Sequence, residues 1–528
     1  MPAMILRALR RCLPLLAVTA VLPVEAQESR LGTVSFPTSA GPAAQAEFLT
    51  GVLWLHSFEY VRAADAFRRA QTIQPDFALA YWGEAMTHTH PVWNEQDLRA
   101  GREILRRLGP DAATRRARAP TDRERRYLDA VEVLYGEGSK AGRDTLYAQA
   151  MERLVRAYPE DHEAKAFYAL SLLGLNQGIR DTVQYLASAP YADTVFRANP
   201  LHPGAAHYLI HAYDDPFHAR KGLDAARAYS GIAPDAPHAQ HMTTHIFLAL
   251  GMWDEVVSQN RIAMRLTAHI PGHYSSWLHY GLLQQGRVHE ALRLLERLHA
   301  DRSVSSGSST HTYESLMRAN QLLHFEERQG GPAQWELEVQ RMTPLGRVID
   351  TYVRGAMAYR RRDGAVLAAA SAEAGSVVAD LRSLTVEEGT TPELMQAEVM
   401  ARELGALLLF LNGAREAAVR AMREATALED RIPLEFGPPL IVEPSHELLG
   451  TMLLEMNPTE AMQEFERALV LAPGRSRALQ GLIRAAVAAG DSDRAEAALS
   501  RLGRIWHQAE TICRDELRHL RRLVNGMR

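Results

Sequence analysis

"YVRAADAFRRAQTIQPDFALAYWG" (residues 60–83) has a counterpart near the other end of the chain, "PTEAMQEFERALVLAPGRSRALQG" (residues 458–481). Both stretches place two alanines, a phenylalanine and a proline at the same intervals: Ala63, Phe67, Ala70 and Pro75, then Ala461, Phe465, Ala468 and Pro473. Small alanines let two helices approach closely, the phenylalanine fills the space between helices, and the proline cannot continue a helix. The spacing therefore predicts a helix–turn–helix unit that is used at both ends.

This pattern resembles the tetratricopeptide repeat, a helix–turn–helix of about 34 residues. Weaker copies occur in "LALGMWDEVV" (residues 248–257) and "HYGLLQQGRVHEALRLLERL" (residues 279–298). The resemblance covers most of the chain between residues 45 and 505. It implies an all-α solenoid, a right-handed superhelix in which the first helix of each repeat lines a concave groove. Members of that family mostly bind peptides and other proteins in this groove.

The N-terminus predicts export from the cell. Arg7, Arg10 and Arg11 precede an apolar stretch from residue 13 to residue 24, and Ala26 ends a small-residue cleavage site. We therefore expect a periplasmic or secreted protein. The expected organisation is a signal peptide (1–26), an N-terminal extension (27–44), a His-rich repeat array (45–300), a flexible loop (301–310) and a second repeat array (311–528).

The composition narrows the function classes. The chain has 528 residues and a formal net charge of -4, so it offers no basic surface for a nucleic acid. No segment after the signal peptide is apolar enough to predict a membrane span. Of the two cysteines, Cys12 leaves with the signal peptide and only Cys513 remains. A single thiol excludes an internal disulfide and a thiolate zinc cluster, so a metal site must use His, carboxylate or Met.

Histidines supply the candidate metal ligands. The chain has 21 histidines, and two stretches repeat the pattern His-x-x-x-His: "HPGAAHYLIHAYDD" (residues 202–215) and "PHAQHMTTHIF" (residues 237–247). Residues four apart on a helix share one face, and two imidazoles one turn apart can chelate one ion. Because the pairs are 34 residues apart, adjacent repeats would bring them together. We predict a transition-metal site of copper, iron or zinc with the ligands His207, His211, His241 and His245.

Other residues take groove-facing positions if the resemblance holds, and they are possible additions to this site: His56, His90, His238, His273, His446 and Tyr280. Glu447, beside His446, offers a carboxylate. His90 lies in the stretch "EAMTHTHPVWNEQD" (residues 84–97). His446 follows a Pro-rich stretch, "EFGPPLIVEP" (residues 435–444), in which the prolines exclude a helix. That stretch is either a lid over the groove or a rigid connection.

Two functions remain open at this point. The first is a metalloprotein on a solenoid, in which copper or non-haem iron redox chemistry fits a thiolate-free histidine set best and zinc-assisted hydrolysis comes next. The second is a periplasmic scaffold whose groove binds a small molecule, a peptide or an exported protein without catalysis. The sequence around the two His pairs contains little Lys, Arg or Asn, which favours the metal site. No nucleophile elbow, P-loop or dinucleotide fingerprint is present, and the sequence leaves open whether the protein is an enzyme.

Overall fold

The computed structural model describes residues 30–177, 179–267, 270, 272–301, 308–325, 332–335, 337–384 and 391–527. These residues form 25 α-helices, five 3-10 helices and one two-stranded ribbon. The first helices are α1 (Pro42–His56), α2 (Tyr60–Ile73), α3 (Ala78–Met86), α4 (Leu98–Leu108), α5 (Ala112–Ala117), α6 (Asp122–Leu134), α7 (Lys140–Ala157), α8 (His162–Leu173) and α9 (Thr182–Ala198). The ribbon pairs β1 (Thr89–His90) with β2 (Glu95–Gln96) around η1 (Pro91–Trp93), and η2 (Gly174–Asn176) follows α8.

The central helices are α10 (Pro203–Tyr213), α11 (Ala219–Ile232), α12 (Pro237–Ala249), α13 (Trp253–Arg265), α14 (Gly272–Gln284) and α15 (Val288–Ala300). The last third contains α16 (Ser308–His324), η3 (Pro332–Gln334), η4 (Val339–Arg341), α17 (Pro344–Arg360), α18 (Gly364–Leu384), α19 (Pro392–Leu411), α20 (Arg415–Glu429), α21 (Ser445–Leu453), α22 (Pro458–Leu471), α23 (Ser476–Ala489), α24 (Ser492–Ile505), η5 (Trp506–Gln508) and α25 (Thr511–Asn525). Consecutive helices pack pairwise, so the predicted all-α repeat architecture is confirmed.

The repeated phenylalanine explains this pairwise packing. A Cβ atom on Gly51 of α1 would lie 2.6 Å from the Phe67 ring, and one on Gly83 of α3 would lie 2.3 Å from it. Phe67 of α2 therefore fills the space that two glycines leave on the neighbouring helices. The second clear copy repeats the arrangement, because a Cβ atom on Gly481 of α23 would lie 2.2 Å from the ring of Phe465. The same packing rule thus operates at both ends of the chain.

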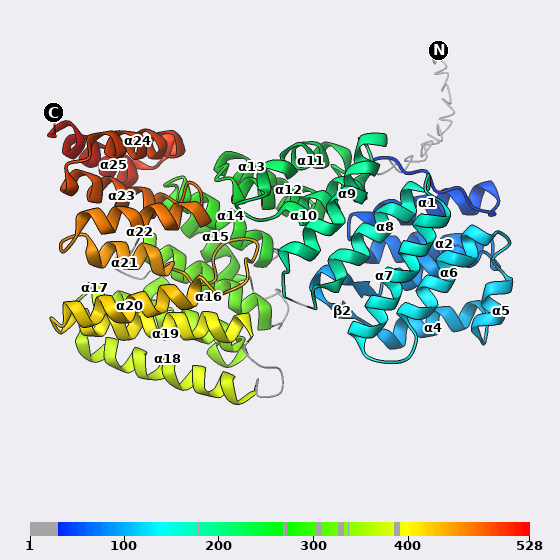
Figure 1. Cartoon of the computed structure of the whole chain (residues 1–528), viewed down its shortest axis with the longest axis horizontal. Coiled ribbons are helices and arrows are strands. Elements are labelled where there is room, and N and C mark those ends of the chain that lie inside the picture. Colours follow the sequence, from blue (N-terminus) through cyan, green and yellow to red (C-terminus); the bar gives the residue numbers. More distant parts are fainter. Residues whose placement is uncertain are drawn as a thin grey trace, which may run out of the picture.

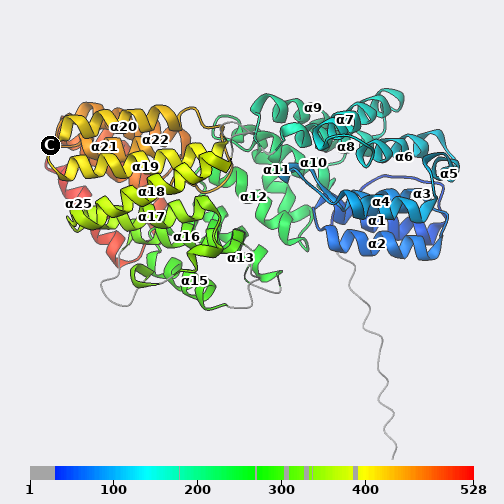
Figure 2. The ribbon, with the colours of Figure 1, turned by 90° about the horizontal axis from the view of Figure 1, so that it is seen from below.

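The chain runs from the N-terminal helices at one end of the molecule to the C-terminal helices at the other, with α9–α15 between them (Figure 1). The C-terminal helices pack back on the middle of the chain (Figure 2). Trp253 at the start of α13 donates from Nε1 to the carbonyl of Gly474 at 3.0 Å, and Trp506 donates to the carbonyl of Gln284 at 2.9 Å. These contacts join helices that are more than 200 residues apart in sequence.

The N-terminal segment ties α1 to the central helices. The backbone N–H of Thr33 donates to the carbonyl of Leu201 at 2.9 Å, and Arg30 forms an ion pair with Asp235. Gly32 has a φ of +87°, and a Cβ atom there would lie 2.4 Å from the carbonyl oxygen of Leu201, so this close approach requires glycine. The end of α1 is thereby placed beside α10, which brings residues of the first repeat to the histidine-rich helices.

The predicted signal peptide lies outside the described residues, as does most of the predicted loop 301–310, but Ser308 already begins α16. Helix α1 begins at Pro42, within the expected N-terminal extension. One described helix, α18, is long and apolar enough to cross a membrane by length and composition, which the sequence analysis did not anticipate. Its apolar side chains Leu367, Ala370, Ala374 and Val377 are buried, and the helix packs between α17 and α19.

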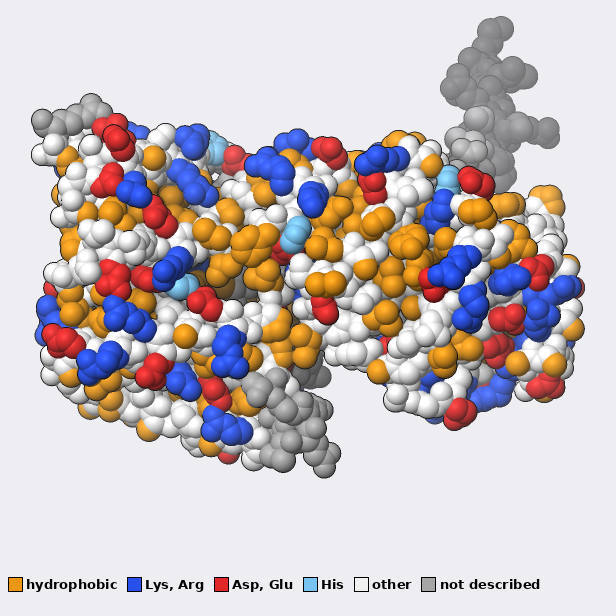
Figure 3. Space-filling view, in the orientation of Figure 1, with side chains coloured by type: hydrophobic (Ala, Val, Ile, Leu, Met, Phe, Trp, Pro, Cys, Tyr) orange, Lys and Arg blue, Asp and Glu red, His pale blue; other side chains and the backbone are white. Residues whose placement is uncertain are grey.

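Side chains of both charges are interspersed over the face drawn in Figure 3, and apolar side chains lie between them. This mixed pattern agrees with the small net charge of the chain.

Candidate metal centre

Six histidines of three neighbouring first helices come together in the middle of the molecule. They form two groups whose candidate ligand atoms lie within 4.8 Å of one another. We name them by their helices: the α10–α12 triad is His207, His211 and His238, and the α12–α14 triad is His241, His245 and His273. The four predicted ligands are therefore all present, but they are divided between two triads instead of sharing one ion.

In the α10–α12 triad, the Nε2 atom of His207 is the common neighbour of the other two rings. It lies 3.1 Å from Nε2 of His211 and 3.3 Å from Nε2 of His238. Two nitrogens bound to one tetrahedral ion at about 2.0–2.1 Å are about 3.3 Å apart. Nδ1 of His207 donates to the carbonyl oxygen of His56 at 2.7 Å, which leaves a lone pair on Nε2. The triad thus has the nitrogen spacing of a metal site before any ion is bound.

The α12–α14 triad repeats this arrangement. Nε2 of His241 and Nε2 of His245 lie 3.2 Å apart, and Nδ1 of each ring points to a fixed partner. Nδ1 of His241 donates to Oδ1 of Asn260 at 2.8 Å, and Nδ1 of His245 donates to Asp214 at 2.5 Å. Asn260 is oriented by its own amide group, which donates to the Thr244 hydroxyl and to a backbone carbonyl. His273 completes the triad, and its Nδ1 lies 3.0 Å from the hydroxyl of Tyr313.

Burial keeps most of these rings neutral. Desolvation is the largest cause that lowers the pKa of His207 and of His273 to about 3, and nearby histidines act in the same direction. The pKa values of His211, His238 and His241 are also lowered well below the usual histidine value, first by burial and then by neighbouring rings. The neutral imidazole is the form that binds a metal ion. These five rings therefore present lone pairs at neutral pH and lose no proton when an ion binds.

Aromatic side chains cover both triads. Phe58 lies over the α10–α12 triad, with its ring 4.3 Å from that of His207, and Phe58 holds a positive φ of 55° that is costly for this residue type. The ring centroids of Trp277 in α14 and His245 are 4.3 Å apart. The four predicted ligands are consequently 0–4% exposed, so they do not line an open groove.

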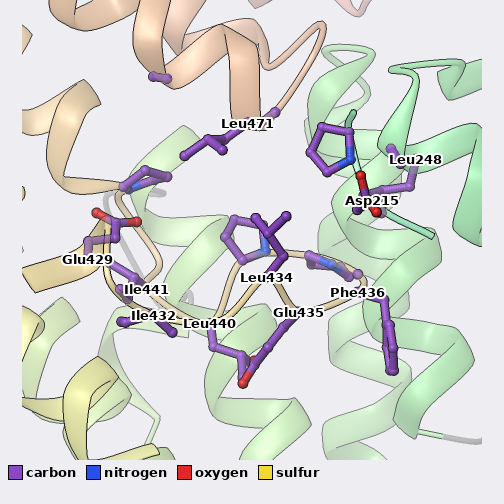
Figure 4. A pocket seen from close by; sticks show the side chains of 18 of the residues that line it. Asp215, Leu248, Glu429, Ile432, Leu434, Glu435, Phe436, Leu440, Ile441 and Leu471 are labelled. Atoms are coloured by element: carbon purple, nitrogen blue, oxygen red, sulfur yellow. The ribbon is translucent and has the colours of Figure 1, made fainter. Parts of the chain in front are cut away.

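The Pro-rich segment between α20 and α21 (residues 430–444) also packs over the two triads. Phe436 projects from this segment toward the central helices (Figure 4). The centroid of its ring lies 6.4 Å from that of His211 and 5.7 Å from that of His245. It therefore contacts one ring of each triad. Gly437 follows with a φ of +102°, and a Cβ atom there would lie 2.7 Å from the Trp277 ring. The segment lies over both triads and also connects α20 to α21, so the geometry fits both alternatives that the sequence left open.

His56 belongs to a third group, with Glu163 and His202. Nε2 of His56 and Nε2 of His202 lie 2.8 and 3.1 Å from the two carboxylate oxygens of Glu163. Nδ1 of His56 bonds the hydroxyl of Tyr208, and Nδ1 of His202 accepts from the backbone N–H of Ala205 at the start of α10. Every ring nitrogen of this group has a hydrogen-bond partner, so the group forms a buried hydrogen-bond network. His56 contacts the α10–α12 triad through its carbonyl oxygen, which accepts from Nδ1 of His207.

The remaining predicted residues lie apart from the triads. His90 stacks on Tyr60 and bonds Glu95. His446 lies between Glu464 and Asp430; burial opposes its protonation, but the hydrogen bonds to these carboxylates raise its pKa. Both ring nitrogens of His446 are therefore engaged by carboxylates, which leaves neither nitrogen available to a metal.

Glu447 and Tyr280 share a partner. Both bond the guanidinium of the buried Arg475, at 2.6 and 2.9 Å. Tyr280 and His446 line a cavity of about 190 Å³ behind Phe436, and Asp214 reaches the same cavity. This volume is below the roughly 300–1,000 Å³ of sites for drug-sized ligands, so the cavity fits only a small molecule.

The sequence analysis missed several residues that the structure places at the centre. Asn260, Tyr313, Phe58 and Phe436 come from helices or loops up to 229 positions away from the His-x-x-x-His pairs. A periodic pattern carries no signal for such contacts. The positions of His238 and His273 were recognised, because both are second residues of a first helix.

Comparisons with known proteins identify the repeat but not the site. The profile of the tetratricopeptide repeat family matches residues 452–508. No curated protein matches the chain. Among solved structures, the chain is similar to a human IFIT1 dimer with m7Gppp-AAAA, at 14% identity and a TM-score of 0.35, over 93% of this chain and 90% of that one. It is also similar to yeast Tom70, at 13% identity and a TM-score of 0.28, over 92% and 95% of the two chains. Similarities at this level carry no argument about ligands or partners.

Proposed function

We propose that this protein binds transition-metal ions through the α10–α12 and α12–α14 triads. The observation that carries the proposal is the pair His241 and His245. Both rings direct Nδ1 to a fixed acceptor, so neutral rings direct two lone pairs at each other across 3.2 Å. A buried pair of acceptors without a donor is unfavourable, and a cation between them removes the conflict. The other arrangement that satisfies the pair is a proton on Nε2 of His245, and the experiment below separates the two.

The donor set selects the kind of metal. Each triad offers three imidazole nitrogens, and the described part of the chain places no thiolate near either triad. Imidazole suits copper, iron and zinc, whereas magnesium and calcium prefer oxygen ligands. Three protein ligands leave a coordination position open for water or a substrate. Copper or non-haem iron redox chemistry is the activity that we favour, and zinc-assisted hydrolysis is the next.

The predicted N-terminal export signal is consistent with the same function. An exported, oxidising compartment suits a metal site that uses no thiolate, because it does not depend on keeping cysteines reduced. We therefore place the mature protein, from about residue 27, in the periplasm or outside the cell.

A second candidate function is a scaffold that binds a peptide or an exported protein. The match of residues 452–508 to the tetratricopeptide repeat profile favours it, because repeat proteins of this type commonly present a binding surface. In that case the buried histidines serve the stability of the array, and no metal is bound.

Elemental analysis of the mature protein, purified without a His-tag, tests the proposal. The double variant His207→Ala/His241→Ala removes one nitrogen from each triad and is the comparison. Near-stoichiometric copper, iron or zinc in the wild type and none in the variant supports the metal site. No metal in the wild type, even after incubation with each ion, overturns it. Circular dichroism of both proteins establishes that the variant is folded. The loaded protein is then assayed for oxygen consumption and for hydrolysis.

A further inference from the structure

The two triads are copies of one site, related by the repeat. His207 and His241 are 34 residues apart, as are His211 and His245, while His238 and His273 are 35 residues apart. In each copy, two histidines one turn apart on a first helix meet the second residue of the next first helix. Because α12 contributes to both copies, the repeat itself generates two adjacent sites.

The copies differ in how their rings are held. In the α12–α14 triad, each ring turns one nitrogen away from the triad to a named partner: Asn260, Asp214 and Tyr313. In the α10–α12 triad, His207 has such a partner, but Nδ1 of His211 is buried and bonds to no atom of the described residues. A ligand ring without such a hydrogen bond is less firmly oriented and is a weaker donor. The α12–α14 triad is therefore the better organised site.

The copies also differ in charge. The carboxylate of Asp214 is 2% exposed and bonds the ring of His245 directly. The corresponding position in the other copy is the unpartnered Nδ1 of His211. A carboxylate behind a histidine ligand makes the ring more basic and places a negative charge near the ion, where low solvent exposure strengthens the attraction.

The sites are close enough to influence each other. The rings of His211 and His245 are 6.2 Å apart between centroids, and those of His238 and His241 are 6.4 Å apart. An ion in one triad therefore repels a second cation in the other, and this repulsion separates the two binding steps further.

From these differences we infer that each chain binds two metal ions in unequal sites, and that the α12–α14 triad fills first. This inference rests on the proposed function. Loss of the hydrogen-bond partner behind a ligand ring typically weakens metal binding by about 10–100-fold, so we expect two dissociation constants that differ by at least about tenfold.

A titration of the metal-free mature protein with Zn²⁺ at pH 7.5, in competition with a chromophoric chelator, tests the inference. His211→Gln removes one imidazole ligand of the α10–α12 triad, and His273→Gln removes one of the α12–α14 triad. We expect two steps in the wild type, loss of the weaker step in His211→Gln, and loss of the tighter step in His273→Gln. In Asp214→Asn, the tighter step weakens by about 10–100-fold.

The outcomes separate this inference from the proposed function. No Zn²⁺ binding by the wild type overturns the proposed function itself. A single bound ion, two steps of equal affinity, or loss of the tighter step in His211→Gln overturns the inference and leaves metal binding in place. If Asp214→Asn does not fold, the two one-site variants still decide the order, because His211→Gln must bind its remaining ion more tightly than His273→Gln binds its own.

Discussion

Nε2 of His241 lies 3.2 Å from Nε2 of His245, and both rings are locked by hydrogen bonds at their opposite nitrogens. The side chains are therefore already arranged for a shared ion, and their rotamer entropy has been lost during folding. A ligand that binds such a preformed site does not have to order it.

We expect zinc to stabilise the folded protein. An ion that binds only the folded chain adds about 2.7 kcal/mol to the free energy of unfolding when its free concentration is 100 times its dissociation constant. We expect the urea midpoint of the wild type to rise with added Zn²⁺. The double variant His207→Ala/His241→Ala serves as the control, and an equal rise in this variant would show that the ion acts elsewhere.

Acid destabilises the metal-free protein. Burial lowers the pKa of His207 and of His273 to about 3, whereas the unfolded chain binds these protons near pH 6.5. The contribution of these two neutral rings to the free energy of unfolding is therefore complete above about pH 6.5 and is lost as the pH falls toward 3. Urea unfolding at pH 7.5, 6 and 5 measures the fall, which should be smaller in His207→Gln.

The contribution of His446 to stability has the opposite pH dependence. Burial opposes its protonation, but Glu464 and Asp430 raise its pKa above the unfolded value. Its contribution is complete below about pH 6.5 and is lost as the pH rises through the folded pKa. His446→Gln should therefore cost more stability at pH 5 than at pH 9, and an equal cost at both values would contradict the assignment.

We expect Phe436 to slow the exchange of ions at the two triads, because its ring lies against His211 and His245. Truncation in Phe436→Ala opens the contacts with His211 and His245 but removes no ligand. We expect bound Zn²⁺ to transfer to an excess of chelator at least several-fold faster, with a smaller change in affinity. Leu434→Ala, in the same Pro-rich segment, is the matched variant, since Leu434 lines the neighbouring cavity. If both variants release the ion at the wild-type rate, the segment is only a connection.

Glu163 stabilises the fold without holding a metal. It is fully buried and accepts bonds from His56 and His202. Glutamine offers one acceptor oxygen where Glu163 offers two, so one buried imidazole N–H is left unpaired, at a cost of about 1–3 kcal/mol. Glu163→Gln should therefore lower the free energy of unfolding while the metal content per folded chain stays the same. A proportional loss of metal would instead place a ligand in this third group.

Phe67 tests the packing rule of the repeat. It is fully buried against Gly51 and Gly83, and Phe→Ala changes in cores cost about 3–5 kcal/mol. Val61, on the same helix α2, is 77% exposed, so Val61→Ala should change the free energy of unfolding by less than about 0.5 kcal/mol. Chemical denaturation of the two variants gives the comparison, and similar losses in both would refute the role of Phe67.

Local periodicity determined the helices and the two histidine pairs. One helix pair contains the whole interval pattern of Ala63, Phe67, Ala70 and Pro75. A spacing of four residues places His207 and His211 on the same face of any α-helix. The 34-residue offset also brought the second pair to the adjacent first helix. These relations depend only on neighbours along the chain and between successive repeats.

Only the tertiary structure decided which histidines act together and what surrounds them. The division of the four predicted ligands into two triads depends on how α10, α12 and α14 are rotated against one another. The carbonyl of His56 and the ring of Phe436 reach the centre because the N-terminal segment and residues 430–444 pack against the middle of the array. Such contacts join residues 151 or more positions apart, and their free energy comes from burial in one folded core, which no local pattern encodes.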